Sequence, residues 1–106
     1  MAKYMFQGSY TAEGARGVLK DGGSARRAAV EKLAASTGGK LESFYFTFGA
    51  DDFVIIVDAP DNVSAAAVAM TVASSGAVSL RTTVLLTTEQ ADEVAKRVVD
   101  YRAPGT

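Results

Sequence analysis

The fold is decided by residues 42–60, which read ESFYFTFGADDFVIIVDAP. The first half alternates, with Phe44, Phe46 and Phe48 on one side, and this period of two predicts a strand over 40–48. The second half, 52–59, is rich in β-branched residues, as central strands are. Gly49 and the residues up to 51 predict a tight turn between the halves. The stretch therefore predicts a β-hairpin in the middle of the chain.

Patterns on both sides of this hairpin complete the fold. Alternation predicts strands over 3–10 and 77–86. Helices are predicted over 12–20 and 24–36, interrupted at Asp21-Gly22-Gly23, and over 62–75, followed by a last helix from Thr87 or Thr88 with an apolar stripe at 91, 94, 95, 98 and 99. The order is the ferredoxin-like βαββαβ with an extra C-terminal helix, in the α+β class with a four-stranded antiparallel sheet. We expect one domain over 1–106, with 101–106 as an extended tail.

The sheet face turned away from the helices is predicted to be mixed in character. Alternation places there apolar and polar side chains together: Met5, Gln7, Leu41, Tyr45, Val54, Ile56, Asp58, Arg81, Thr83 and Leu85. This face is too apolar to stand in water and too polar for a sealed core. Packing on the same face of another copy solves both problems, so we expect a homodimer or higher homo-oligomer of the dimeric α/β-barrel type.

The composition excludes several classes of function. The 106 residues include no His, Cys or Trp. Soft-ligand metal sites, haem held by His or Cys, and Ser-His-Asp or Cys-His catalysis are therefore excluded, and no cofactor is expected. No apolar run is long enough to span a membrane. The sequence has no basic patch joined to exposed aromatic residues, so nucleic-acid binding is not expected. The N-terminus leads straight into a strand without a signal peptide, so a cytoplasmic location is expected.

A candidate anion site lies at the start of the second helix. Ser24 begins this helix, and Arg26 and Arg27 follow in its first turn. Free N–H groups and a partial positive charge at a helix start attract anions, and cations there are unfavourable unless an anion or an acidic surface compensates them. With Arg81 these residues form the candidate set for a small carboxylate or phosphate. Solvated surface arginines, or salt bridges between subunits, are the alternatives.

A candidate acid–base site joins Asp58 and Tyr45 on the face away from the helices. Asp58 follows the apolar run Ile55-Ile56-Val57, where desolvation would raise its pKa. A carboxylate beside a tyrosine could act as a general base on a small organic substrate. The alternative is that Asp58 pairs with Arg81 or with backbone donors near the end of its strand.

Two further residue sets carry weaker signals. Three aspartates, at 51, 52 and 61, could hold Mg²⁺ or Ca²⁺, but their spacing matches no cation loop, so no metal site is expected and Asp52 should bond turn amides. The aromatic side chains are expected to form the core, with a pocket wall as the alternative: Tyr4, Phe6, Tyr10, Phe44, Phe46, Phe48 and Phe53.

Several blocks resemble one family. These are GGSARR at 22–27, GGKLE at 38–42, FGADD at 48–52, APD at 59–61 and TTVLLT at 82–87. Together, over about residues 3–100, they resemble the GYD-domain proteins. In the Gly-x-Tyr-Asp turn that gives the family its name, Gly49 and Asp52 match, and Asp51 occupies the position of the tyrosine. The resemblance implies a short bacterial protein with a ferredoxin-like, dimeric α/β-barrel fold, and it implies no particular activity.

Three functions are consistent with these observations. The leading hypothesis is a homo-oligomeric α/β-barrel module that binds a small anionic or aromatic molecule, or serves a structural or assembly role. The second is a cofactor-independent enzyme acting on a small carbonyl or phenolic compound, with Asp58 and Tyr45 moving protons. The third is a regulatory protein whose basic corner, residues 20–27, engages an acidic partner. Whether the chain is catalytic is left open by its sequence.

Overall fold

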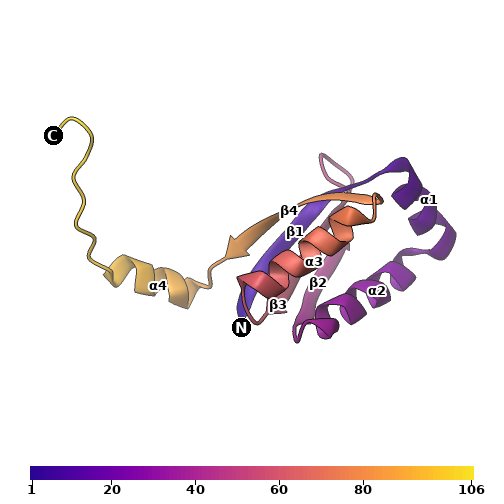
Figure 1. The fold of residues 1–106 in the computed structure, drawn as a ribbon, viewed down its shortest axis with the longest axis horizontal. Helices are drawn as coiled ribbons and strands as arrows, with labels where there is room; N and C mark the ends of the chain where they lie inside the picture. Colours follow the sequence, from indigo (N-terminus) through magenta and orange to yellow (C-terminus); the bar gives the residue numbers. More distant parts are fainter.

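The computed structural model describes residues 1–106 and contains four strands and four helices. They are β1 (Ala2–Tyr10), α1 (Ala12–Asp21), α2 (Gly23–Ser36), β2 (Lys40–Phe46), β3 (Phe53–Ala59), α3 (Asn62–Ser74), β4 (Val78–Leu85) and α4 (Thr88–Lys96). The strands form one antiparallel sheet in the order β2-β3-β1-β4. Helices α2 and α3 cover one face of it (Figure 1). This confirms the α+β ferredoxin-like fold. None of the helices is long and apolar enough to cross a membrane.

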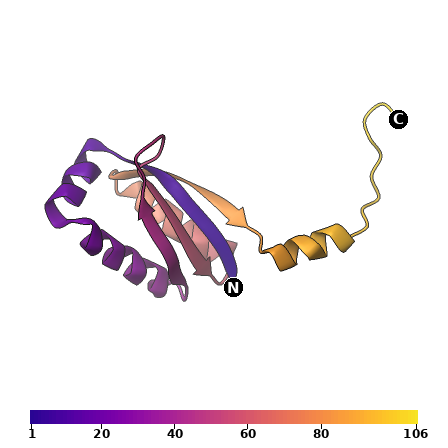
Figure 2. The same cartoon turned by 180° about the vertical axis from the view of Figure 1, so that it is seen from behind.

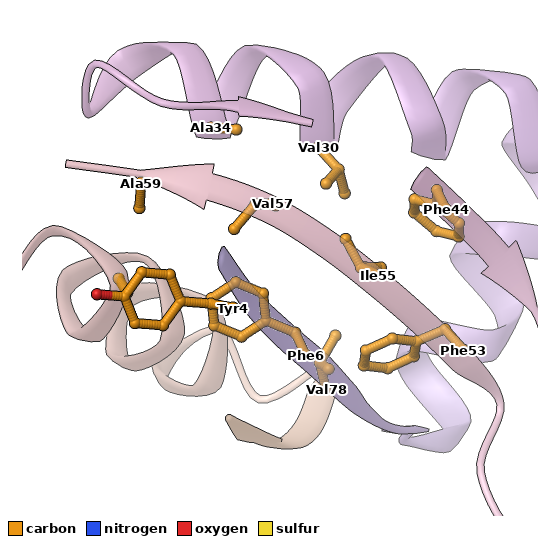
Figure 3. Close-up of a cluster of buried hydrophobic side chains, with 11 residues drawn as sticks. Tyr4, Phe6, Val30, Ala34, Phe44, Phe53, Ile55, Val57, Ala59 and Val78 are labelled. Atoms are coloured by element: carbon orange, nitrogen blue, oxygen red, sulfur yellow. The ribbon is translucent and has the colours of Figure 1, made fainter. Parts of the chain in front are cut away.

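The core lies between the sheet and helices α2 and α3 (Figure 3). Its side chains come from every layer: Tyr4, Phe6, Val30, Ala34, Phe44, Phe53, Ile55, Val57, Ala59, Ala65 and Val78. Tyr4 is the most enclosed large side chain, at 2% exposure, and its hydroxyl donates a hydrogen bond of 2.6 Å to Asn62 Oδ1 at the start of α3. A buried hydroxyl needs such a partner, so this bond fixes where α3 lies on the sheet.

The β2–β3 hairpin differs from the prediction at its tip. Strand β2 ends at Phe46, because the Thr47 N–H donates to the Asp52 carbonyl oxygen (2.8 Å) and closes the loop outside the sheet. Phe48 lies in that loop and is fully exposed, and Phe46 is 45% exposed outside the core, so the predicted place of both in the core is wrong. Asp52 also bonds a different group than expected. Its carboxylate accepts from the Tyr10 N–H on β1 (3.0 Å), not from amides of the turn.

A β-bulge changes which face the start of β2 presents. Leu41 pairs with Val57 and Ser43 with Ile56, so Glu42 is an extra residue that pairs with no residue of β3. A bulge of this kind shifts the alternation by one residue. Leu41 therefore lies on the helix-covered face and packs against the core, and its predicted place on the opposite face is wrong.

The other sheet face has no helix over it, as the view from behind shows (Figure 2). We call it the open face. It carries Met5, Gln7, Tyr45, Val54, Ile56, Asp58, Arg81, Thr83 and Leu85, as predicted apart from Leu41. Met5, Val54 and Ile56 are only half-buried within the single chain. The face is thus an uncovered apolar surface crossed by charged side chains.

The C-terminal helix α4 stands away from the rest of the molecule (Figure 1). Thr87 and Gln90 form a capping box that fixes its start, yet none of its residues is buried. The chain is accordingly elongated, with a radius of gyration of 16.9 Å, against about 13 Å for a compact domain of this length. The helix ends at Lys96, so the predicted apolar stripe at Val98 and Val99 continues into non-helical chain.

Candidate functional site

Asp58 lies on the open face in an ion pair with Lys3. The Lys3 ammonium is 2.8 Å from Asp58 Oδ1 and 2.7 Å from Glu42 Oε1, so it ties β1 to both β3 and the bulge of β2. The hydrogen bond to Asp58, and to a smaller extent the one to Glu42, raise the pKa of Lys3. The side chain of Asp58 is 16% exposed. Its partner is thus Lys3, and not Arg81 as the alternative interpretation of the sequence had it.

Tyr45 and Arg81 lie far from Asp58. Tyr45 is opposite Val54, four residues along β3 from Asp58, which is about 13 Å at the rise of a strand. Arg81 stands on β4, where its guanidinium donates to both carboxylate oxygens of Asp51 at 3.1 and 2.8 Å. That pair lowers the pKa of Asp51 and raises that of Arg81. The structure therefore does not bring the two predicted acid–base residues together within one chain, nor Arg81 to Asp58.

The four predicted anion-binding residues separate in the same way. Ser24 is exposed, and Arg27 Nε lies 3.1 Å from Glu31 Oε1 in an exposed pair one turn along the helix. Arg81 is on the open face, on the other side of the sheet from α2. Arg26 is the only one of the four that is half-buried, and it lines a cleft between α1 and α2. Arg81 lines a separate hollow on the open face.

The cavity at Arg26 is an open cleft of about 300 Å³ between α1 and α2. Its walls come from both helices, the end of β1 and the start of β4: Tyr10, Glu13, Gly14, Gly17, Val18, Asp21, Gly22, Ala25, Arg26, Ala29, Ala77 and Val78. The bend between the helices is at Gly22, whose φ of 87° is accessible to glycine at little cost. The cleft exists because the broken helix wraps around this corner of the sheet.

The start of α1 is held against the turn that precedes β4. Thr11 donates its N–H to the Ala77 carbonyl oxygen at 2.9 Å and its hydroxyl to that of Gly76 at 3.0 Å. Gly14 is needed for this close approach, since a Cβ there would lie only 2.1 Å from the Ala77 oxygen. These contacts set the position of one wall of the cleft.

The cleft has acidic side chains, Glu13 and Asp21, on its α1 wall, and hydrogen-bond donors at Tyr10 and Arg26. The Arg26 Nε is buried and has no hydrogen-bond partner. The Tyr10 ring packs against Phe53 and Phe46, with centroids 5.3 and 6.4 Å away. Burial raises the pKa of the Tyr10 hydroxyl, and the nearby positive charge of Arg26 only partly offsets this. At neutral pH the cleft thus offers a protonated phenol and a guanidinium as neighbouring donors.

Below these two residues the cleft meets an apolar interior. Tyr10, Arg26 and Val78 also line a narrow cavity of about 40 Å³ between the sheet, α2 and α3, whose other walls are almost all aliphatic or aromatic. The site is therefore polar around Tyr10 and Arg26 and apolar in the part that adjoins them. That arrangement suits a small molecule with an anionic group and an apolar body.

Tyr10 was placed by the sequence only among the core aromatics. A signal was present, because it is the last residue of β1 and directly precedes Thr11, the cap of α1. A side chain at a strand end beside a helix start lies at the rim of the core, where clefts form. Its pairing with Arg26, sixteen residues later, depends on the bend at Gly22 and carries no local pattern.

The three aspartates near the hairpin each have a different role. Asp51 binds Arg81, Asp52 accepts from the Tyr10 N–H, and Asp61 caps α3 by accepting from the Ser64 N–H at 2.8 Å. The bonds to Ser64 lower the pKa of Asp61. No group of three His, Cys, Asp or Glu side chains in the chain lies close enough together to hold a metal ion.

The hairpin turn is tied to two other strands, β1 and β4. Asp52 of the Gly49–Asp52 turn anchors the hairpin to β1, and Asp51, at the position of the family's tyrosine, binds Arg81.

No curated protein and no solved structure matches the chain. The model of one family, the GYD domain, matches residues 4–95. This match covers three strands in full, all but the first two residues of β1, and most of the chain, and we conclude that the protein belongs to the GYD-domain family.

Proposed function

We propose that the protein is a homo-oligomeric α/β-barrel module that binds a small organic anion in the cleft beside Tyr10 and Arg26. The observation that carries the proposal is the buried Arg26 Nε without a partner. A buried donor left unsatisfied costs about 1–3 kcal/mol, and a small movement of the side chain that brings Nε to an anionic acceptor would remove this cost through a charge-assisted bond. Because apolar side chains flank the two donors, the ligand class is a carboxylate or phenolate with an apolar body.

Ligand binding is tested with benzoate, 4-hydroxybenzoate and inorganic phosphate as probes, by isothermal titration calorimetry. Arg26→Gln and Arg27→Gln are a matched pair, since both remove a guanidinium from the first turns of α2 and only Arg26 lines the cleft. We expect benzoate to bind the wild type and the Arg27 variant equally, and the Arg26 variant at least ten-fold more weakly. Equal binding by both variants, or no binding of any probe, would overturn the ligand part of the proposal.

Self-association through the open face is supported by its composition. Met5, Val54 and Ile56 leave an apolar surface half-uncovered, and the charged side chains among them are already paired, Asp58 with Lys3 and Arg81 with Asp51. Paired charges are less costly to cover than single ones. Two such faces would pack about 10 Å apart, as sheets in sandwiches do.

The oligomer is tested by native mass spectrometry at micromolar concentration. Ile56→Lys places a charge in the middle of the open face, whereas Ser36→Lys, at the exposed end of α2, is the control. We expect Ile56→Lys to lower the assembly mass and Ser36→Lys to leave it unchanged. A monomeric wild type would overturn the barrel. The proposal includes the cytoplasmic location expected from the N-terminal sequence, which fractionation of cells expressing a tagged chain tests.

A further inference from the structure

Strand β4 is an edge of the sheet and its outer side pairs with nothing. The Thr11 N–H donates to the Ala77 carbonyl oxygen. In an antiparallel ladder every second residue bonds the same neighbour, so residues 77, 79, 81, 83 and 85 direct their backbone groups toward β1. The residues between them therefore direct their N–H and C=O groups outward: Val78, Leu80, Thr82 and Val84. Strands with long free edges usually carry proline, a bulge or several charges that prevent pairing. Strand β4 has eight residues, no proline and one charged residue, Arg81.

The outward-bonding residues also have self-complementary side chains. They lie on the helix-covered face of the sheet, and Leu86 continues the series. Antiparallel pairing of two copies of β4 about Thr82 sets Leu80 opposite the partner's Val84, and Val78 opposite the partner's Leu86. Val84 and Leu86 are 56% and 61% exposed in the single chain, so this pairing covers two unprotected apolar side chains in each copy. Pairing about Arg81 instead would set two guanidinium groups side by side.

The same register gives the C-terminal arm, residues 86–106, a place on the second copy. Thr87 falls level with the partner's Ala77, so α4 continues past the partner's turn at 75–77, where α3 ends and α1 is anchored. In the single chain α4 stands away from its own domain and buries none of its residues (Figure 1). The Val94 side chain of α4 is 60% exposed.

The exposed area is sufficient for such a contact. The chain exposes 7252 Å² and has a mass of 11.0 kDa. A compact monomer of this mass exposes about 5,600 Å², so about 1,600 Å² is in excess. A standard interface takes about 800 Å² from each partner. The excess can therefore supply the edge contact, the arm and part of the open face.

We propose that β4 of one copy pairs with β4 of a second copy, antiparallel about Thr82, and that each C-terminal arm lies across its partner. This contact is separate from the open face, so it goes beyond the function proposed above and does not depend on it. Used together, the two two-fold contacts build a tetramer with two eight-stranded sheets packed face to face.

The register is tested by disulfide formation in the full chain, which has no cysteine of its own. Two copies of Thr82→Cys would meet on the two-fold axis, with Cα atoms about 5.5 Å apart, within the range a disulfide spans. In the control Ser79→Cys, the thiols would be six residues apart along the paired strands, or about 20 Å. We expect mild oxidation to cross-link the Thr82 variant at least ten-fold more than the Ser79 variant. Equal yields would overturn the pairing.

The backbone contact is tested by Thr82→Pro, with Thr82→Val as its control. The Thr82 N–H points outward, so proline removes no bond within the chain, whereas valine keeps the N–H and removes only the hydroxyl. We expect native mass spectrometry to show the proline variant at half the wild-type mass and the valine variant unchanged. A proline variant at full mass would overturn the edge contact, even where Ile56→Lys shows that the open face is used. If Thr82→Pro fails to fold, the cross-linking yields decide.

Discussion

Replacing Arg26 by methionine should stabilise the protein while it weakens ligand binding. Methionine keeps the unbranched stem that packs beside Tyr10 and removes the buried Nε that has no partner. Leaving such a donor unsatisfied costs about 1–3 kcal/mol. Part of this gain is lost with the apolar contacts of the longer side chain, so we expect a net stabilisation of about 1 kcal/mol. For a domain of this size that corresponds to a rise of about 4–8 °C in Tm.

The assay is urea unfolding followed by circular dichroism, at one fixed protein concentration because the assembly state affects apparent stability. Arg27→Met is the control. It removes the exposed pair with Glu31, and such pairs stabilise helices by about 0.2–0.5 kcal/mol, so this variant should be slightly less stable than the wild type. A loss of stability in Arg26→Met larger than that in Arg27→Met would show that the Arg26 guanidinium is satisfied, and the argument for an anion site would fail.

Three other predictions follow from single contacts. Tyr4→Phe should destabilise the fold by about 1 kcal/mol, because it removes the buried hydroxyl that holds the start of α3, and urea unfolding measures this. Gly39→Ala should destabilise it by more than about 3 kcal/mol or prevent folding, since its Cβ would lie 2.3 Å from a β3 carbonyl oxygen; a soluble variant with a wild-type unfolding midpoint would contradict this. The Asp51–Arg81 pair lowers the pKa of Asp51, so its stabilising effect is present above pH 4 and is lost as the pH falls further. The difference in urea midpoint between wild type and Asp51→Asn should therefore shrink between pH 7 and pH 3, and a difference that grows on acidification would refute the assignment.

The sheet and its helices could be predicted because their signals are local. The alternation around Phe44 and the β-branched residues of β3 define strands without knowledge of their neighbours. Where the prediction of the sheet was wrong, a contact between distant residues was responsible. The bulge at Glu42 depends on the register with β3, and the Asp52 carboxylate bonds β1 and not the amides of the turn. Neither leaves a trace in the local pattern.

The candidate site was predicted less well than the fold. The sequence singled out Arg26 for its place in the first turn of a helix, but gave Arg27 and Ser24 equal standing. Only the rotation of α2 on the sheet decides which of the two arginines faces inward. The pairing of Asp58 with Lys3 was missed for a similar reason, because the order of strands in the sheet, and not their sequence, brings these two residues side by side.

The break between α1 and α2 has a consequence for how a molecule reaches the cleft. Helix α1 buries none of its residues, and its ends depend on the glycine hinge at Gly22 and on the bonds of Thr11. Opening it exposes little apolar surface and leaves the sheet intact, so it belongs to the part of the molecule with the lowest local unfolding free energy. Amide hydrogens of α1 should exchange with solvent well before those of β1 and β3. Local opening of α1 would therefore widen the cleft while the sheet stays folded.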